Sequence, residues 1–167
     1  MFYTQFGINT DYSGTGIAVD AAGNLYVADV NNFRVRKIDR QGVITTIAGT
    51  GHSGYSGDGG PAIAAQLFGP GSLAFDAEGN LYIADFISVE DGSRVRKIDQ
   101  DGIITTVAGG GKPGAAVEGG LATSAWLAIG GMAFDAEGNL YIADRNSASV
   151  RRVDKNGFIT TFAGGRP

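Results

Sequence analysis

The stretch Asp20-Ala-Ala-Gly-Asn-Leu-Tyr-Val-Ala-Asp29 determines how this chain is organised, because it occurs three times. It returns as Asp76-Ala-Glu-Gly-Asn-Leu-Tyr-Ile-Ala-Asp85 and again as Asp135-Ala-Glu-Gly-Asn-Leu-Tyr-Ile-Ala-Asp144. Successive copies start 56 and 59 residues apart. A period of this length is typical of proteins built from repeated supersecondary units.

Two more motifs follow each copy in a fixed order. The first is Arg34-Val-Arg-Lys-Ile-Asp39, Arg94-Val-Arg-Lys-Ile-Asp99 and Ser149-Val-Arg-Arg-Val-Asp154, and the second is Val43-Ile-Thr-Thr-Ile-Ala-Gly49, Ile103-Ile-Thr-Thr-Val-Ala-Gly109 and Phe158-Ile-Thr-Thr-Phe-Ala-Gly164. These runs are short, rich in β-branched and aromatic residues, and bounded by turn residues. Each repeat therefore predicts four strands, which in the first repeat are residues 16–20, 24–29, 34–39 and 43–48.

The polarity of the strands predicts their order. The second strand of a repeat, Leu25-Tyr-Val-Ala28, is apolar on both faces and should be covered above and below. The third and fourth strands carry arginines, lysine and threonines and should lie further out. We predict an all-β chain, a single β-propeller module over residues 1–167, with four-stranded blades at about 16–49, 72–109 and 131–164. Residues 1–7 resemble the fourth strand and are a candidate for an extra outer strand.

Three blades do not close a propeller, which usually has four to eight. Two copies of the chain would supply six blades, and we expect a homodimer with two-fold symmetry in which each chain is half of the ring. The alternative is that the chain is a fragment of a longer propeller.

Composition excludes several classes of function. The 167 residues include no cysteine and one histidine, which argues against a disulfide scaffold, a thiolate zinc site and a multi-histidine metal site. The net charge of −4 argues against nucleic-acid and anionic-membrane partners. We predict no catalytic residue, metal or cofactor. No signal peptide or membrane-spanning run is evident, so the cytoplasm is the default compartment.

The 28 glycines are unusually many, and the repeat explains much of this excess. Gly23, Gly79 and Gly138 each end an Asp-x-x-Gly turn between the first two strands. Glycine adopts positive φ there without a Cβ clash, while the aspartate bonds backbone amides. We assign these three glycines a structural role.

The ordered motifs resemble the NHL repeat, a β-propeller blade, over about residues 16–164. The glycine-rich segment 49–62 is similar to the inter-blade linkers of bacterial NHL-repeat proteins. This resemblance implies a propeller, commonly six-bladed and usually a binding platform, in a family whose bacterial members are often exported. It favours a non-enzymatic binding or scaffold protein with a protein or small-ligand partner. The alternative is a propeller lyase or lactone-type hydrolase with a metal in the central channel.

Charged residues flank the loop between the second and third strands. The pairs Asp29 with Arg34 and Asp85 with Arg94 predict ion pairs that hold each hairpin. A ring of charges that recognises a carboxylate or phosphate is the functional alternative. Ser149 interrupts the pattern in the third repeat, which argues against a symmetric ring.

The linkers 49–71 and 109–131 carry most of the candidate ligand-binding residues, because loops on one propeller face concentrate binding side chains. The candidates are His52, Tyr55, Asp58, Glu118 and Trp126. Phe86 is added because it starts an insertion, residues 86–93, that repetition does not require. The structural alternative is that the linkers are folded caps over the blade junctions and that Trp126 packs there.

Overall fold

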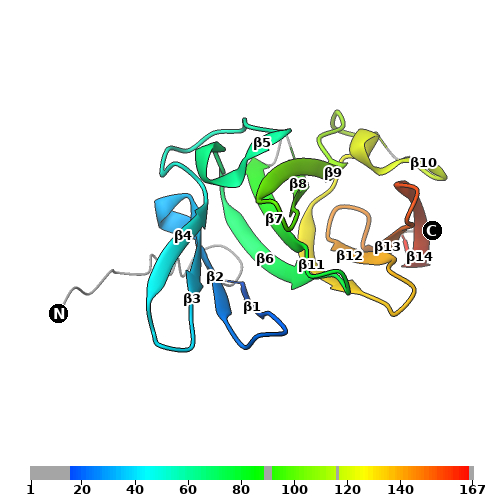
Figure 1. The fold of residues 1–167 in the computed structure, drawn as a ribbon. Coiled ribbons are helices and arrows are strands. Elements are labelled where there is room, and N and C mark those ends of the chain that lie inside the picture. The colour runs from blue at the N-terminus through cyan, green and yellow to red at the C-terminus, as the bar shows by residue number, and fades with distance from the viewer. Residues whose placement is uncertain (1–15, 89–91, 116, 166–167) are drawn as a thin grey trace.

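Three antiparallel sheets stand side by side in the computed structural model (Figure 1), which describes residues 16–88, 92–115 and 117–165. The expected extra strand at residues 1–7 lies outside the described residues. The prediction of an all-β chain is confirmed, because strands dominate and the helical elements are single 3₁₀ turns.

Each sheet is built from consecutive strands. Sheet 1 contains β1 (Ile17–Val19), β2 (Leu25–Asp29), β3 (Arg34–Ile38) and β4 (Ile44–Ala48), with η1 (Val30–Asn32) between β2 and β3. Sheet 2 contains β5 (Gly60–Pro61), β6 (Pro70–Phe75), β7 (Leu81–Ser88), β8 (Gly92–Ile98) and β9 (Ile103–Gly109), and η2 (Ala62–Ala64) follows β5. Sheet 3 contains β10 (Gly120–Leu121), β11 (Ile129–Phe134), β12 (Leu140–Asp144), β13 (Ser149–Val153) and β14 (Phe158–Gly164), and η3 (Ala122–Ser124) follows β10.

The repeated Asp-x-x-Gly turn has the hydrogen bonds that its sequence predicts. In the first copy the Asn24 backbone N–H donates to Asp20 Oδ1 at 2.8 Å, and the Asn24 side chain donates to Asp20 Oδ2 at 2.7 Å. The second and third copies repeat both bonds. Gly23 has a φ of +82°, a conformation that favours glycine. A local motif therefore fixes the hairpin between the first two strands of every repeat.

Sheets 2 and 3 have a fifth strand that the sequence did not predict. The first linker runs along the outer edge of sheet 2, where Gly60 and Pro61 of β5 pair with Ile104 and Ile103 of β9. The second linker pairs β10 with β14 in the same way. A two-residue strand has no alternation to recognise, and proline is confined to edge strands because it cannot donate to a ladder.

The core lies between the sheets and includes an Ala-x-x-Ala-x-Leu segment from each linker. Ala62, Ala65 and Leu67 pack between sheets 1 and 2, where they meet Ala28, Val35 and Ala48 of sheet 1. Ala122, Ala125 and Leu127 pack in the same way between sheets 2 and 3, against Ala84, Val95 and Ala108 of sheet 2. The linkers are thus part of the core and fix each sheet against the next.

The glycine that ends each fourth strand passes very close to the third strand. Gly109 has a φ of +80°, and a Cβ built on it would lie 2.1 Å from the Ser93 carbonyl oxygen. Gly102 has a similar φ of +77°, but a Cβ there would meet nothing within 4 Å. Both positions therefore require a positive φ, but only Gly109 also lacks the space for a Cβ atom.

Gly109→Ala should destabilise the fold much more than Gly102→Ala. Left-handed backbone alone costs about 1 kcal/mol for alanine, and overpacking against a backbone atom adds about 2 kcal/mol more at Gly109. The free energies of unfolding, measured by urea titration, test this difference. Equal losses in the two variants would contradict the close approach at Gly109.

Candidate binding site

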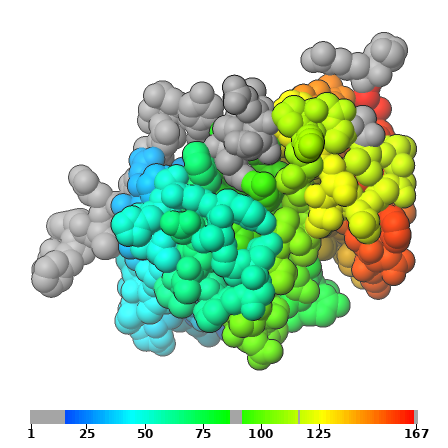
Figure 2. Space-filling model, turned by 90° about the horizontal axis from the view of Figure 1, so that it is seen from above, coloured from blue at the N-terminus to red at the C-terminus, as the bar shows by residue number. Residues whose placement is uncertain are grey.

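Both linkers spread over one end of the molecule (Figure 2). This end carries His52, Tyr55 and Asp58 from the first linker and Glu118 and Trp126 from the second. A cluster of polar side chains there is centred on Tyr55.

The Tyr55 ring stacks against two guanidinium groups. The Arg94 Cζ atom lies 3.9 Å from the ring centroid, and the Arg96 Cζ atom lies 4.8 Å from it. The phenol group donates a hydrogen bond to Asp58 Oδ2 at 3.1 Å and lies 2.9 Å from Thr106 Oγ1. Tyr55 therefore joins the linker to the outer strands of sheet 2 through both its face and its hydroxyl group.

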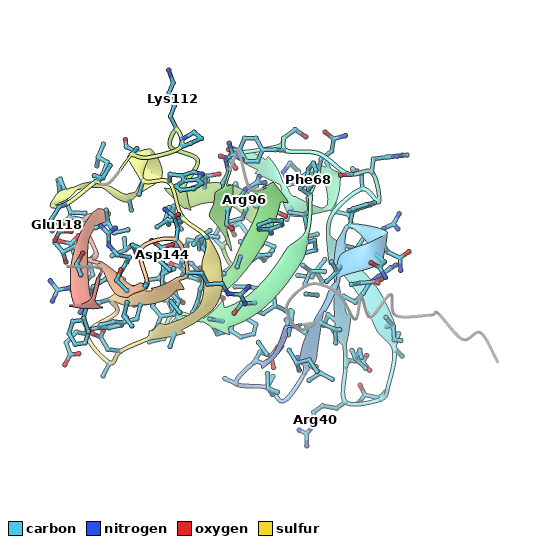
Figure 3. All side chains as sticks on the ribbon, turned by 180° about the vertical axis from the view of Figure 1, so that it is seen from behind. Arg40, Phe68, Arg96, Lys112, Glu118 and Asp144 are labelled. Atoms are coloured by element: carbon cyan, nitrogen blue, oxygen red, sulfur yellow. The ribbon has the colours of Figure 1, made fainter. Side chains whose placement is uncertain are left out.

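Arg96 connects this surface cluster to the interior. It is fully buried, and its Nη2 atom donates to Asp58 Oδ1 at 2.8 Å and to the Ser56 carbonyl oxygen at 3.0 Å. Its Nη1 atom lies 4.0 Å from Asp85 Oδ2. Figure 3 shows Arg96 between the linker and the strands of sheet 2. The guanidinium thus bridges an exposed carboxylate and a buried one.

Asp85 is fully buried within β7. Its Oδ1 atom accepts hydrogen bonds from the backbone N–H groups of Phe68 and Gly69, at 2.9 and 2.8 Å. In the described part of the chain, its Oδ2 atom has no hydrogen-bond partner. Burial raises the pKa of the Asp85 carboxyl to about 6, although the two backbone bonds and the nearby Arg96 and Arg94 charges lower it.

Asp58 behaves in the opposite way. Burial raises its pKa, but hydrogen bonds from Thr106 and the charge of Arg96 outweigh this effect, so the pKa of the Asp58 carboxyl lies below its ordinary value. Asp58 is therefore the charged partner of Arg96, and the two carboxylates that flank this guanidinium have different protonation behaviour.

The predicted pairing of Asp29 with Arg34 and of Asp85 with Arg94 is wrong. Arg36 makes the ion pair with Asp29, with 2.9 Å between Arg36 Nε and Asp29 Oδ2, while Arg34 donates to the carbonyl oxygen of Thr50 at 2.8 Å. In sheet 2 Arg94 lies on Tyr55 instead. Both arginines of each Arg-Val-Arg motif share a face of the sheet, and the long side chain of the second reaches the aspartate diagonally.

An internal signal could have identified the correct arginine. The second arginine of the motif is present in all three repeats, as Arg36, Arg96 and Arg151, whereas Ser149 replaces the first in the third repeat. In sheet 3 Arg151 donates to the Val117 carbonyl oxygen and lies 3.4 Å from Glu118 Oε2. A buried or half-buried arginine that bonds the linker or the strand-end aspartate is thus common to the repeats.

The structure separates the other candidates from the Tyr55 cluster. His52 is exposed, and its backbone N–H donates to Thr50 Oγ1 at 3.4 Å. Phe86 lies in β7 with its side chain 37% exposed. Trp126 packs closely on Gly92, where a Cβ would lie 2.7 Å from Trp126 Cδ1, so it lies at the junction of sheets 2 and 3.

The sequence did not predict a cleft at the opposite end of the molecule. It has a volume of about 570 Å³ and lies between sheets 1 and 2, where Tyr26 and Phe75 make an edge-to-face contact at 4.9 Å and Lys37 Nζ lies 5.7 Å from the Tyr26 ring centroid. Asp20 and Asp99 add carboxylates to its lining. The size and the mixture of apolar and charged groups suit a small ligand.

Residues 16–88, 92–115 and 117–165 contain no group of three or more His, Cys, Asp and Glu side chains arranged to hold a metal ion. None of the helical turns in these ranges is long and apolar enough to cross a membrane.

Arg96→Met should destabilise the fold far more than Arg94→Met. Loss of Arg96 leaves Asp85 buried without its cation, which typically costs about 3–5 kcal/mol. Loss of Arg94 removes one contact with Tyr55, worth about 1 kcal/mol. Chemical unfolding of both variants measures the difference, and a larger loss for Arg94→Met would restore the pairing rejected above.

Asp85 should also make stability depend on pH. Because its folded-state pKa is raised above the unfolded value, its carboxyl favours the folded state at low pH and disfavours it increasingly as pH rises from about 4 to about 6. Relative to the wild type, Asp85→Asn should gain up to about 3 kcal/mol over this range. Unfolding titrations across pH 4–7 test this, with the exposed Asp101→Asn as control. A stability difference between Asp85→Asn and wild type that stays constant with pH would contradict it.

Family models match two parts of this chain. The teneurin NHL domain matches residues 50–117, and the NHL repeat matches residues 15–38. Teneurin-3 of Mus musculus is 35% identical over 100 residues, which covers 52% of this chain and 4% of the teneurin. Teneurin-1 of Gallus gallus is 35% identical over 107 residues, which covers 56% and 4%. The chain thus spans a small part of these relatives.

Solved structures share the arrangement of the sheets. A structural genomics protein of unknown function from Bacteroides thetaiotaomicron is 26% identical with a TM-score of 0.63, over 89% of this chain and 35% of that one. Virginiamycin B lyase from Staphylococcus aureus is 14% identical with a TM-score of 0.58, over 95% and 43%. The lyase shows a common fold alone. The recurring motifs and the matched models thus identify NHL repeats within residues 15–38 and 50–117, and the chain resembles NHL-repeat β-propellers.

Proposed function

We propose that this chain is a non-enzymatic binding or scaffold module that completes its ring by self-association, each sheet acting as one blade. The observation that carries the proposal is that the two end faces expose apolar side chains whose counterparts inside the molecule are buried. Such surfaces mark interaction sites in soluble proteins.

The end face of sheet 1 is the first of these surfaces. Ile17 is 59% exposed, whereas Leu73, at the same position of the second repeat, is 7% exposed. Ile44 is 39% exposed and its counterpart Ile104 is fully buried. The sequence supplies this face of sheet 1 with core-type residues, but no other sheet formed by residues 16–88, 92–115 and 117–165 covers it.

The end face of sheet 3 is the second. Phe162 is 60% exposed there. A groove of about 320 Å³ is lined by Ala143, Val150 and Ala163, which correspond to the residues that receive Ala-x-x-Ala-x-Leu segments on sheets 1 and 2. The groove therefore suits the packing of further polypeptide, which a second copy of the chain would bring.

The surface available for a partner is the linker end with Tyr55 and the cleft at the opposite end. In the linker cluster the charged groups bond one another, so they hold the fold while the exposed parts of Tyr55 and Asp58 face outward. This supports a protein or small-ligand partner more than a catalytic role. A propeller lyase or lactone-type hydrolase remains the alternative class, supported by fold likeness alone.

Light scattering after gel filtration tests self-association. We expect a mass of about twice 17.2 kDa for the wild type. Ile17→Lys and Phe162→Glu should each give the monomer mass, because a buried charge would oppose packing of the end faces. Ile63→Lys is the matched control, since Ile63 is 50% exposed but lies on the first linker.

A stable wild-type monomer would reject self-association and support the alternative that further NHL repeats of a longer protein cover both faces. A dimer that survives both end-face substitutions would place the interface elsewhere and also contradict the proposal.

A further inference from the structure

Sheet 3 repeats most of the Tyr55 cluster without its aromatic ring. In sheet 2 the ring of Tyr55 is held by Arg96 on its face and by Asp58 and Thr106 at its hydroxyl group. The sequence repeat places Arg151, Glu118 and Thr161 at the corresponding positions of sheet 3. Each of the three has the same kind of side chain as its counterpart in sheet 2, but Tyr55 has no aromatic counterpart in the sequence of the third repeat.

The three counterparts are assembled in the same way. Arg151 is buried, with 3.4 Å between its Nη2 atom and Glu118 Oε2. Glu118 accepts hydrogen bonds from the Thr161 backbone N–H at 2.9 Å and from the Thr161 hydroxyl at 3.0 Å. Figure 3 shows Glu118 beside β14 at the edge of sheet 3. A guanidinium and a carboxylate–hydroxyl pair therefore lie together, as they do around Tyr55.

The ring and the first arginine of the motif are replaced together by small residues. Ala115 occupies the position of Tyr55 in the repeat, and Ser149 occupies that of Arg94. A pocket of about 300 Å³ is found here, lined by Val117, Glu118, Ser149, Arg151 and Thr161 among others. This volume is at the lower end of ligand pockets and suits a group of the size of one ring.

The guanidinium group of Arg151 is buried and lines this pocket. The residue is 5% exposed, and its Nε atom, like that of Arg96, is buried without a hydrogen-bond partner in the described part of the chain. No aromatic ring within residues 16–88, 92–115 and 117–165 lies over its guanidinium, whereas Tyr55 covers that of Arg96. A buried guanidinium that lines a pocket and has no ring stacked on it favours a ligand with a π face.

We propose that this pocket binds a phenol group, with its ring on Arg151 and its hydroxyl bonded to Glu118 and Thr161. The carboxylate of Glu118 disfavours phosphate and other anions, and the Arg151 charge disfavours cations, so a neutral aromatic ring with a hydroxyl group fits both. The site lies within one chain, between the second linker and sheet 3, and does not depend on ring closure.

An NMR titration with N-acetyl-tyrosinamide tests the site. We expect saturable shifts of the Ser147, Thr161 and Gly165 amides, and at least about tenfold weaker binding of N-acetyl-phenylalaninamide, which lacks the hydroxyl. Titrations with p-cresol and with a tyrosine-containing pentapeptide distinguish two sources of the phenol group. Tighter binding of p-cresol indicates a free phenol, and tighter binding of the pentapeptide indicates a tyrosine side chain of a protein. Equal affinity for the tyrosine and phenylalanine amides, or no saturable shift, would overturn the proposal.

Two variants sharpen the test. Glu118→Ala removes an exposed side chain and should reduce the preference for tyrosinamide to less than about threefold, while the exposed Glu137→Ala should keep it. The double substitution Tyr55→Ala with Arg94→Ser should open the matching pocket in sheet 2 and add a second site with shifts near Thr106. A folded double variant without this second site would contradict the assignment.

Discussion

The packing of the Ala-x-x-Ala-x-Leu segments between neighbouring sheets is the constraint on which the rest of the structure depends. Ala62, Ala65 and Leu67 are almost completely buried between sheets 1 and 2. Because alanine is small, the linker backbone comes close enough for Gly49 and Thr50 to donate N–H groups to the carbonyl oxygens of Ala62 and Ala65, both at 3.0 Å. This anchor fixes the end of the linker, and the preceding residues are then held against β8 and β9, where Tyr55 and Asp58 find their partners.

Comparison of equivalent positions in the three repeats shows which residues are retained and which are replaced. The second arginine of the motif is kept in each repeat, as Arg36, Arg96 and Arg151, which agrees with a structural role for the ion pairs that it makes. Tyr55 and Arg94, which stack on one another, are replaced together in the third repeat. The framework is therefore shared by all repeats, while the surface above it differs from one junction to the next. Recognition of a partner would depend on these differences, since a ring of identical units could not distinguish one junction from another.

The sequence predicted those parts of the fold that local residues determine. The Asp-x-x-Gly turns and the central strands follow from short motifs, since Asp20 bonds residues only four positions away. The β5 strand could not be predicted, because Gly60-Pro61 has no strand pattern and its position depends on the packing of the linker. The strand register places Arg34 opposite Asp29, whereas the side chain of Arg36 makes the ion pair, so the position of an arginine along the strand could not by itself identify the partner. The cleft beside Tyr26 and Phe75 combines residues from two repeats, so no single motif could indicate it.

Each linker contacts two neighbouring sheets. These contacts define which segment of the chain could be duplicated or exchanged as one unit. Its alanines and leucine cover the face of the preceding sheet, while its β5 strand completes the edge of the following one. A duplication or exchange that breaks the chain inside the linker would separate these two roles and leave both sheets incomplete. A break at Gly49 or Gly109 moves a linker together with the sheet that follows it. Such a module includes the Ala-x-x-Ala-x-Leu segment that packs on the preceding sheet. Recombination could therefore lengthen or shorten the array one sheet at a time.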